Sequence, residues 1–577
     1  MGPSINSLEK IMQLVQTGMD VARLNLSHGT HEEHIQTINL LKEAREKMKQ
    51  PLAIMLDTKG PEIRLGKVPK EGIEVHPGSR LLITKEQIEG TKDVVSIRPA
   101  FVLDHLKVGI TILIDNGYIL SKVVEVTKDG IIIEIENSGV IYSSKGVNIP
   151  NCEIPLPSLT EKDVTDIEMG CQNGIDMIAA SFVRSPENVI DIKRILARLG
   201  RSDIQVIAKI ENNEGVHNFD GILQVADGIM VARGDLGVEV PLAQVPKLQK
   251  MMIRKCNIIG KPAVTATQML ESMMNNPRPT RAEASDVANA IYDGTSAVML
   301  SGETAIGKYP IETVQIMKDI VRESEHDFDY KAFFELHSKM TYNDVPSALT
   351  LSTVKTAYSL GAKAIFAFTH SGTTARLLAR LKPQIPIVAL TPSEETYHQL
   401  AVTWGVTPVL CPEATTIEEA FTAASRFAIH NHLASYGDLV VVTSGSPLWV
   451  PGTTNMILVE SIGDVLVRGH MGYGSKVHGN VTLVASSDLA KSYLIHGQIL
   501  VIPKYEAVFD PLIAEASAVI LQNTVEDKQS EKELIERCLA TGKTVITRVD
   551  GAFRILREGQ LVTIDPEKAL VYKGVVR

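Results

Sequence analysis

The chain of 577 residues has few cysteines, no basic run and no long apolar segment. Its five cysteines include no Cys-x-x-Cys pair, a pattern that fits reduced thiols in a cytoplasm better than a disulfide framework or a zinc site. The net charge is −10, and no run of five or more Lys or Arg occurs, which argues against a nucleic-acid partner. No stretch approaches the length of a membrane span, and nothing resembles a signal peptide. We therefore expect a cytoplasmic protein that binds neither nucleic acid nor a membrane.

The sequence contains enough hydrophobic residues to form several cores. Hydrophobic residues make up 44% and charged residues 22%, which is typical of globular proteins. A chain of this length predicts three or four domains, at least one of them with a sizeable core.

Short apolar runs that end in polar residues recur through the first half of the chain, each followed by a helical pattern. Apart from one long gap they are about 25 to 35 residues apart, the length of a strand, a helix and two loops, so they predict a (β/α)₈ barrel. The predicted strands are Val21–Asn25, Leu52–Asp57, Met177–Phe182, Val206–Ile210, Ile229–Arg233, Ala263–Thr267 and Ala297–Ser301.

Only seven such strands can be counted. An eighth should precede Gly2-Pro3-Ser4, where the sequence begins. We therefore expect the first barrel strand to be missing, Met1 not to be the start of the functional protein, and the chain as it stands to be prone to aggregation, because a seven-stranded barrel leaves two unpaired edges and an open apolar interior.

The long gap between the second and third predicted barrel strands has the sequence pattern of antiparallel hairpins. Runs at Thr111–Ile114, Tyr118–Val126 and Ile131–Glu136 are separated by turn residues such as Asn116-Gly117. They predict a small β domain, residues 63–156, inserted into a barrel made of residues 1–62 and 157–340. An insertion at a strand's carboxyl end can act as a lid.

The rest of the chain predicts two further α/β domains. After a helical link near Ile311–Met340, strands alternate with helices in residues 341–471, as in an open α/β domain. Residues 472–577 form another α/β segment. The predicted strands of the first of these domains are Ala364–Thr369, Ile385–Leu390, Thr407–Leu410 and Asp438–Thr443.

Polar side chains end the predicted barrel strands, and active sites of such barrels lie at that end. Alternation sends Arg23, Asn25 and Ser27 to one face, a set suited to phosphate and an ion. Lys209 and Glu211 form a second such pair, and Arg233 with Asp235 a third.

The second and third pairs have two interpretations. Carboxylates at Glu211 and Asp235, on neighbouring strands, are what Mg²⁺ uses when a phosphate completes its octahedron. The alternative is that Lys–Glu and Arg–Asp ion pairs tie the strands together.

Other mouth residues are ambiguous on their own. Gly234 and Gly237 would allow free N–H groups to hold a carboxylate or phosphate, or would simply permit a helix-entry turn. Thr267 and Ser301 add hydroxyls to the mouth, or cap the helices that follow.

His28, His31 and His34 recur every three residues and invite a metal interpretation, which we reject. Thr30 followed by Glu33 is a capping box, so His31 and His34 belong to the first turn of a helix. The i,i+4 pair of a zinc helix is absent.

Eight motifs together resemble the pyruvate kinase family, in family order over residues 2–460. Each is weak alone, but the ordered set is specific. They are Asn25-Leu-Ser-His-Gly29, Asp57-Thr-Lys-Gly-Pro-Glu-Ile-Arg64, Lys145-Gly-Val-Asn148, Lys209-Ile-Glu-Asn212, Ala232-Arg-Gly-Asp-Leu-Gly237, Ala266-Thr-Gln-Met-Leu270, Pro279-Thr-Arg-Ala-Glu283 and Leu300-Ser-Gly-Glu-Thr304.

The resemblance implies phosphoryl transfer from phosphoenolpyruvate to ADP, giving pyruvate and ATP, with Mg²⁺ or Mn²⁺ and K⁺ as cofactors. It assigns the transferring phosphoryl group to Arg23 and Lys209, and the substrate carboxylate to Gly234, Asp235 and Thr267. Thr267 would also order the water that protonates the enolate. It assigns the divalent cation to Glu211 and Asp235. It assigns K⁺ to Asn25, Ser27, Asp57 and Thr58, and Glu62 matches the acidic residue that is linked to K⁺ dependence. It assigns the nucleotide to Asn25, His28, Arg64 and Lys145.

The resemblance also implies a homotetramer and a phosphorylated small-molecule effector. Family members bind the effector at the loop that here contains Thr369, Ser371, Gly372, Thr373 and Thr374. His370 replaces the lysine of fructose-bisphosphate-activated members, which leaves the effector open. The extra C-terminal domain resembles phosphohistidine carriers in length and placement, but no histidine follows His496, which argues against phosphate carriage.

Two other functions are compatible with parts of this pattern. A truncated barrel could survive as a non-enzymatic regulatory subunit, but a scaffold has no reason to keep all these residues together. A pyruvate-handling aldolase or lyase also binds metal enolates, but it needs neither the inserted lid nor Lys145.

Overall fold

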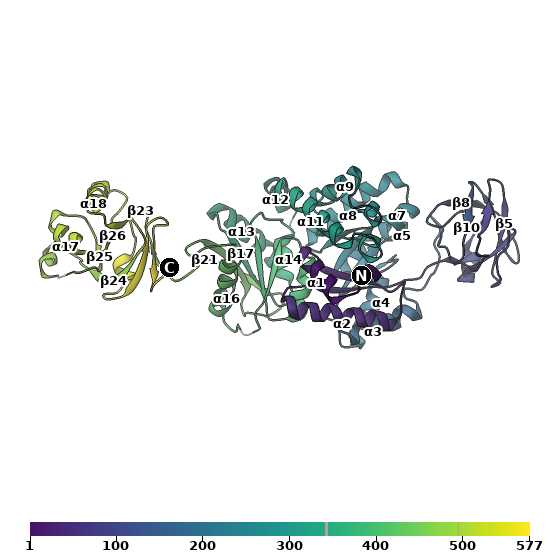
Figure 1. Cartoon of the computed structure of the whole chain (residues 1–577), viewed down its shortest axis with the longest axis horizontal. Helices are drawn as coiled ribbons and strands as arrows, with labels where there is room; N and C mark the ends of the chain where they lie inside the picture. The colour runs from purple at the N-terminus through teal and green to yellow at the C-terminus, as the bar shows by residue number, and fades with distance from the viewer. Residues whose placement is uncertain (341–343, 413, 494, 577) are drawn as a thin grey trace. The chain divides into compact units, whose positions relative to one another are not determined.

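The computed structural model describes residues 1–340, 344–412, 414–493 and 495–576. Its elements follow one another as mixed α/β segments along the chain (Figure 1). Contacts divide the chain into two compact units, the first made of residues 1–354, 367–414 and 444–456 and the second of the remainder. No helix of the described residues is long and apolar enough to cross a membrane.

The barrel sheet is parallel and has seven strands in chain order, as the sequence predicted. Each predicted strand is found within a few residues of its expected bounds. The strands are β1 Val21–Asn25, β2 Ala53–Asp57, β12 Met177–Ala180, β13 Gln205–Ile210, β14 Gly228–Ala232, β15 Ala263–Ala266 and β16 Ala297–Val298.

Helices alternate with these strands and continue beyond the last of them. The helices are α1 Leu8–Thr17, α2 His31–Met48, α3 Glu161–Gln172, α4 Pro186–Arg198, α5 Asn213–His217, α6 Phe219–Val225, α7 Arg233–Glu239, α8 Val245–Ile259, α9 Arg281–Tyr292, α10 Gly302–Ala305, α11 Pro310–His326 and α12 Tyr330–Ser338, with 3₁₀ turns at Pro3–Ile5, Leu242–Gln244 and Glu271–Met274.

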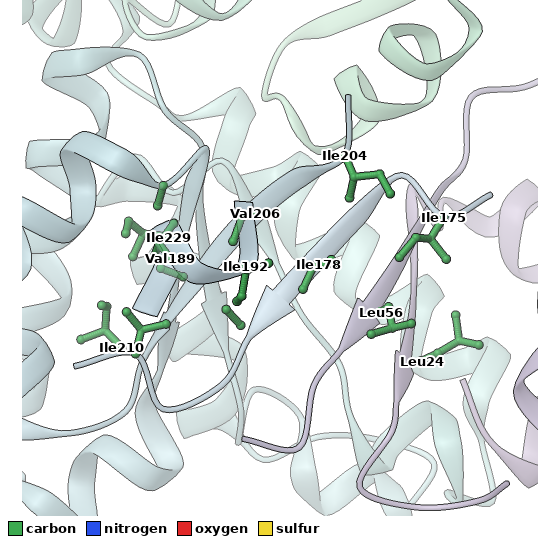
Figure 2. Packing of buried hydrophobic residues seen from close by; sticks show 14 of the residues in the cluster. Leu24, Leu56, Ile175, Ile178, Val189, Ile192, Ile204, Val206, Ile210 and Ile229 are labelled. Carbon is green, nitrogen blue, oxygen red and sulfur yellow. The ribbon is translucent and has the colours of Figure 1, made fainter. Parts of the chain in front are cut away.

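Strict alternation along the strands builds two cores. Outward side chains such as Leu56, Ile178 and Val206 pack with Val189 and Ile192 of α4 (Figure 2). Inward side chains form a second cluster inside the barrel: Ala53, Met55, Met177, Ala179, Ile207, Met230, Val264 and Ala266. The same inward register carries the polar residues at the strand ends to the mouth.

The first and last strands of the barrel sheet do not pair with each other in the described residues. In the sheet order, β1 is bonded to β2 and β16 to β15. A cavity of about 1310 Å³ lies along these edges, lined among others by Met55, Met230 and Val298. Strand β16 stops at Val298 rather than at the predicted Ser301, since it gains ladder hydrogen bonds on one side alone.

The inserted β domain forms a seven-stranded sheet and a two-stranded one, and the predicted hairpins are present. Asn116 and Gly117 both have positive φ, 54° and 82°, as a tight hairpin turn requires. The strands are β3 Arg64–Leu65, β4 Ile73–Val75, β5 Arg80–Thr84, β6 Val94–Arg98, β7 Thr111–Ile114, β8 Ile119–Val126, β9 Gly130–Ile135, β10 Gly139–Ile141 and β11 Val147–Asn148, with a 3₁₀ helix at Ala100–His105.

The third segment is an open sheet of five strands in the order β19-β18-β17-β20-β21. Its predicted strands are found with small shifts. Its elements are α13 Val345–Leu360, β17 Ala364–Phe368, α14 Thr373–Ala379, β18 Ile387–Thr391, α15 Glu394–Gln399, the 3₁₀ helix η5 Leu400–Val402, β19 Val406–Leu410, α16 Ile417–His430, β20 Leu439–Gly445 and β21 Thr454–Ser461.

The C-terminal segment is a mixed sheet of eight strands with short helices, in agreement with the predicted α/β segment. Its elements are β22 Val465–Arg468, β23 Met471–Tyr473, β24 Val477–Leu483, β25 Ile499–Ile502, α17 Asp510–Glu515, β26 Ala518–Leu521, α18 Lys528–Ala540, β27 Thr544–Thr547, α19 Ala552–Ile555, β28 Leu561–Asp565 and β29 Leu570–Lys573, with 3₁₀ turns at Ser487–Ser492 and Ala507–Phe509.

A stretch of the third segment closes the floor of the barrel, and we call residues 398–402 the floor plug. Val402 belongs to the inward cluster of the barrel strands. Gln399 donates hydrogen bonds from Nε2 to the carbonyls of Asp176, at 3.2 Å, and Asp203, at 2.8 Å. The Nδ1 of His398 accepts one from the backbone N–H of Leu52. The barrel interior is thus completed by residues far along the chain.

A buried lysine lies near this floor. Lys382 is 2% exposed, and its ammonium lies 4.3 Å from the ring centroid of Trp404 and 5.9 Å from that of Phe333. It donates to the carbonyl oxygen of Thr295 at 3.3 Å. Burial lowers the pKa of Lys382 to about 7, although the charge of Glu325 acts in the opposite direction.

We predict that Lys382→Met removes a pH dependence of stability. Above pH 7 the native Lys382 loses its proton, while the unfolded chain keeps one until about pH 10.5, so the free energy of unfolding should rise with pH. The rise is at most about 1.4 kcal/mol per pH unit. Thermal unfolding of the wild type and the variant at pH 7 and pH 9 measures it.

The matched control is Lys363→Met, an exposed lysine whose removal should leave the pH dependence unchanged. Identical pH dependence in wild type and Lys382→Met would contradict the prediction.

Candidate active site at the barrel mouth

The centre of the mouth is the ammonium of Lys209, at the end of β13. Its Nζ lies 3.0 Å from Asp57 Oδ1, 3.0 Å from Glu211 Oε1 and 2.7 Å from Ser181 Oγ. Lys209 is 8% exposed, so these acceptors replace water. Burial alone would lower the pKa of Lys209, but the charges of Asp57 and Glu211 outweigh it and raise that pKa. The lysine therefore stays charged.

A second cation joins the same carboxylate. Arg23 of β1 donates from Nε to Asp57 Oδ2 of the neighbouring strand β2 at 2.5 Å, although its register partner on that strand is Met55. Burial alone would raise the pKa of Asp57, but Arg23 and Lys209 hold it below its usual range. Two cations share this carboxylate, and Lys209 also pairs with Glu211, so the two cations and two carboxylates of this network balance in charge.

Glu211 and Asp235 make up the negative side of the mouth. The backbone N–H of Phe182 donates to Glu211 Oε2 at 2.6 Å. Burial raises the pKa values of both carboxyl groups, against the opposing charge of Lys209. The charge of Asp235 adds to the rise for Glu211, and the charges of Glu62 and Asp57 add to it for Asp235. Two crowded carboxylates with raised pKa values gain from a bound divalent cation.

The sequence raised ion pairs as an alternative, and the structure distinguishes the two cases. Lys209 and Glu211 do form a pair, and they lie together at the mouth. Arg233 does not pair with Asp235. It binds Asp286 at 2.7 Å instead, because strand β14 ends at Ala232 and Arg233 begins helix α7, where strand alternation no longer applies.

Thr267 does not cap a helix, contrary to that alternative. Its hydroxyl accepts a hydrogen bond from Gly234 N–H at 2.8 Å and donates one to the carbonyl of Ala266 at 2.7 Å. Its φ is 66°, a strained conformation held by Arg233 Nη2, which donates to the Thr267 carbonyl at 2.8 Å. Gly234 and Gly237 lie inside α7, Gly234 in its first turn, where its N–H has no partner within the helix and is bonded to Thr267 instead.

Ser301 precedes α10 and makes no side-chain cap there. Its side chain lines the cavity along the barrel edge, and its backbone N–H donates to Glu303. Arg23 and Asn25 line the same cavity.

The oxygen-bearing residues of β1 and β2 also come together. Asn25 and Asp57 are register partners, and the Asn25 side chain accepts from Ser27 N–H at 3.1 Å. Thr58 is buried, and its Oγ1 accepts from the N–H of Ser181 at 3.1 Å. These carbonyl, amide and hydroxyl oxygens are ligands suited to a hard cation.

His28, His31 and His34 make contacts within the loop and with the neighbouring helix. His31 Nε2 lies 2.6 Å from Asp166, and His34 Nε2 contacts the carbonyl of His28 at 2.8 Å. The predicted capping box of Thr30 and Glu33 is present. No cluster of three or more metal-ligating His, Cys, Asp or Glu side chains occurs among the described residues.

A cavity of about 900 Å³ connects the inserted domain with the barrel mouth. Arg64 and Lys145 line it from the insertion, and Asp235 and Glu239 from the barrel. Arg64 is paired with Glu62 at 2.7 Å and Lys145 with Asp115 at 2.9 Å. An anionic ligand in this cavity would therefore have to replace Glu62 at Arg64 and Asp115 at Lys145.

The effector-loop residues are only partly accessible. Thr369 and Thr374 are buried, and Thr374 is hydrogen-bonded to the Thr454 hydroxyl at 2.7 Å. Ser371 and Thr373 lie 3.1 Å apart by their hydroxyls. Gly372 adopts φ 79°, which a β-carbon would strain.

Sequence reasoning missed three groups at or near the mouth. They are Ser181, which contacts Lys209; Asp286, which holds Arg233; and Asn148, whose amide donates to Glu239 at 2.8 Å. Ser181 ends a predicted strand, as the other mouth residues do, and that position was the available signal.

Comparison with known proteins assigns these segments to a family. A family model described as "Pyruvate kinase, barrel domain" matches residues 1–314, and one described as "Pyruvate kinase, alpha/beta domain" matches residues 347–460. Proteins named "Pyruvate kinase" from Geobacillus stearothermophilus and Bacillus licheniformis are each 42% identical over 576 residues, and one from Sporosarcina psychrophila is 41% identical over 576 residues. In all three, the alignment covers 99% of this chain and 97% of the relative.

We predict that Mg²⁺ stabilises the wild-type protein and that Glu211→Gln abolishes the effect. A cation that binds the native site at about 100 times its dissociation constant adds about 2.7 kcal/mol to the free energy of unfolding. Thermal unfolding with and without MgCl₂ measures this.

Glu239→Gln, on the same helix as Asp235, is the control and should keep the Mg²⁺ effect. An equal Mg²⁺-dependent rise in Glu211→Gln would show that the cation binds elsewhere.

Proposed function

The chain belongs to the pyruvate kinase family, and from that premise we propose how its residues carry the reaction. It transfers the phosphoryl group of phosphoenolpyruvate to ADP, giving pyruvate and ATP in the last step of glycolysis. The family assignment favours this kinase over the scaffold and lyase alternatives. The observation that supports the roles below is the buried Lys209 ammonium between Asp57 and Glu211.

Arg23 and Lys209 bind the transferring phosphoryl group. Phosphoryl transfer needs positioning and charge neutralisation rather than a covalent enzyme intermediate. Both cations contact Asp57 and Lys209 also contacts Glu211, so a phosphoryl group would bind them by taking the place of these carboxylates.

The substrate carboxylate binds to the backbone N–H groups of Gly234 and Asp235 and to the Thr267 hydroxyl. In the structure Gly234 N–H is bonded to Thr267 Oγ1, and both groups turn to the carboxylate when it arrives. Thr267 then orders the water that delivers a proton to the enolate carbon.

The family generally depends on Mg²⁺ and K⁺. In this chain Glu211 and Asp235 would hold Mg²⁺ or Mn²⁺, and Asn25, Ser27, Asp57 and Thr58 would hold K⁺. The divalent cation neutralises charge on the phosphoryl oxygens when bound. The donor set fits, because two crowded carboxylates leave positions for phosphate oxygens and water.

The nucleotide binds in the cavity below the inserted domain. Arg64 and Lys145 line this cavity and contact the phosphates as the lid closes. The family resemblance also assigns Asn25 and His28 to the nucleotide, and these residues line the cavity along the barrel edges instead. The cavity of about 900 Å³ and the cations that line it support this role.

We also propose the domain organisation given above: a catalytic barrel of residues 1–62 and 157–340, a lid of residues 63–156, a regulatory and assembly domain of residues 341–471, and an extra C-terminal domain of residues 472–577 without a carrier histidine. The junction at 340 and 341 adjoins residues 341–343, which lie outside the described residues. A homotetramer is what the family resemblance implies, and a cytoplasmic location fits the glycolytic activity and the five free cysteines.

The effector site is the loop of Thr369, Ser371, Gly372, Thr373 and Thr374. The exposed hydroxyls of Ser371 and Thr373 and the strained Gly372 would form the phosphate-binding part. The effector is a sugar phosphate or a nucleoside monophosphate.

We predict that Lys209→Met loses at least about 10²–10³ in turnover while the fold is kept, since it removes the charge aimed at the transferring group. A coupled assay for pyruvate from phosphoenolpyruvate, with and without ADP, measures it. Near-normal turnover in the variant would refute the assignment.

K⁺ should activate the enzyme, because Glu62 and the oxygens of Asn25, Ser27, Asp57 and Thr58 form a site for a monovalent cation. The assay compares Mg²⁺ buffers with and without K⁺, in the absence of Na⁺. Full activity without a monovalent cation would contradict this role.

Isothermal titration should detect binding of one of four phosphorylated ligands: fructose 1,6-bisphosphate, ribose 5-phosphate, glucose 6-phosphate or AMP. Thr373→Glu, which places a negative charge in the loop, should abolish it. Absence of binding by all four would end the regulatory proposal.

A further inference from the structure

We propose that Ser181 is a positioning residue that orients the ammonium group of Lys209 for phosphoryl transfer. The inference rests on the proposed role of Lys209 and goes beyond it. Ser181 directly follows β12, and its hydroxyl lies 2.7 Å from Lys209 Nζ. Both residues are less than a tenth exposed, so water does not take over this contact.

An ammonium group has three N–H donors, and each has one acceptor here. Asp57 and Glu211 accept two of them, and Ser181 accepts the third. Ser181 alone among the three acceptors is neutral. It therefore fixes the direction of an N–H bond without cancelling the charge that the phosphoryl group needs.

The serine is itself held rigidly. Its Oγ lies 2.6 Å from the Thr58 carbonyl and 3.1 Å from Asp57 Oδ1, and one hydroxyl proton can serve only one of them. The shorter contact assigns the proton to Thr58, which leaves a lone pair directed to Lys209. The backbone N–H of Ser181 returns a hydrogen bond to Thr58 Oγ1 at 3.1 Å.

The next residue fixes the other side of the ammonium. Phe182 has φ 54°, unusual for a residue with a side chain, and its N–H donates to Glu211 Oε2. The turn at Ser181 and Phe182 thus holds Lys209 and its carboxylate partner at once. When Glu211 turns to a divalent cation, Asp57 and Ser181 keep two N–H bonds in place and the third is free to face the phosphoryl group.

Ser181→Ala tests this role in the full chain. Loss of a hydrogen bond to a charged group should lower kcat about 10-fold to 100-fold. The KM for phosphoenolpyruvate should change by less than about 3-fold, because the missing bond orients a group rather than binding substrate. Ser324→Ala is the control, a buried serine of α11 that donates to the Ile320 carbonyl, and it should keep full kcat.

A double variant separates action through Lys209 from an independent effect. If Ser181 acts by orienting the lysine, adding Ser181→Ala to Lys209→Met should cause no further loss of turnover. A further loss of about 10-fold would show that Ser181 acts without the lysine, and would overturn the proposal.

Ser181 also contacts Thr58, a proposed K⁺ ligand, so the rival explanation is that Ser181 supports the K⁺ site instead of Lys209. Unchanged kcat at saturating K⁺ with a raised half-activating K⁺ concentration would assign Ser181 to the cation site and overturn the inference. If Ser181→Ala does not fold, Ser181→Cys fills the same space with a weak acceptor and should show the same loss of kcat. A wild type that forms no pyruvate would refute the proposed function instead.

Discussion

The mouth of this barrel depends on keeping one ammonium group charged in a nearly dry place. Removing a lysine from water costs several kcal/mol unless opposite charges and hydrogen bonds surround it. Asp57 supplies one of those charges from the end of β2, Glu211 supplies the other from just after Lys209's own strand, and Arg23 balances the second charge by pairing with Asp57. The lowered pKa of Asp57 and the raised pKa of Lys209 are two sides of this one interaction.

Strand periodicity made much of this site predictable. Because side chains alternate, residues two apart at a strand end must share a face, and this placed Arg23 with Asn25 and Lys209 with Glu211. The hairpins of the inserted domain could be predicted equally well, since Asn116-Gly117 adopts a tight turn that few other residue pairs can adopt.

The failures occurred where a local rule stopped applying. Arg233 follows β14 directly but begins a helix, so its partner is Asp286, which no local spacing indicates. The sequence did not single out Ser181 because serine is also common in turns and helix caps. Its role is indicated only by its contact with Lys209 of the next strand. Gly234 is helical although its motif suggested a loop, because tertiary packing overrides the weak helix preference of glycine.

The floor plug means that the catalytic barrel is not a detachable module. Val402 fills space among the inward side chains of the barrel, and Gln399 satisfies two carbonyl groups at its lower rim. A barrel separated from residues 398–402 would expose those carbonyls and part of its apolar interior to water. A fragment built from this barrel must therefore keep residues 398–402, and a substitution in this part of the third segment also changes the interior of the barrel.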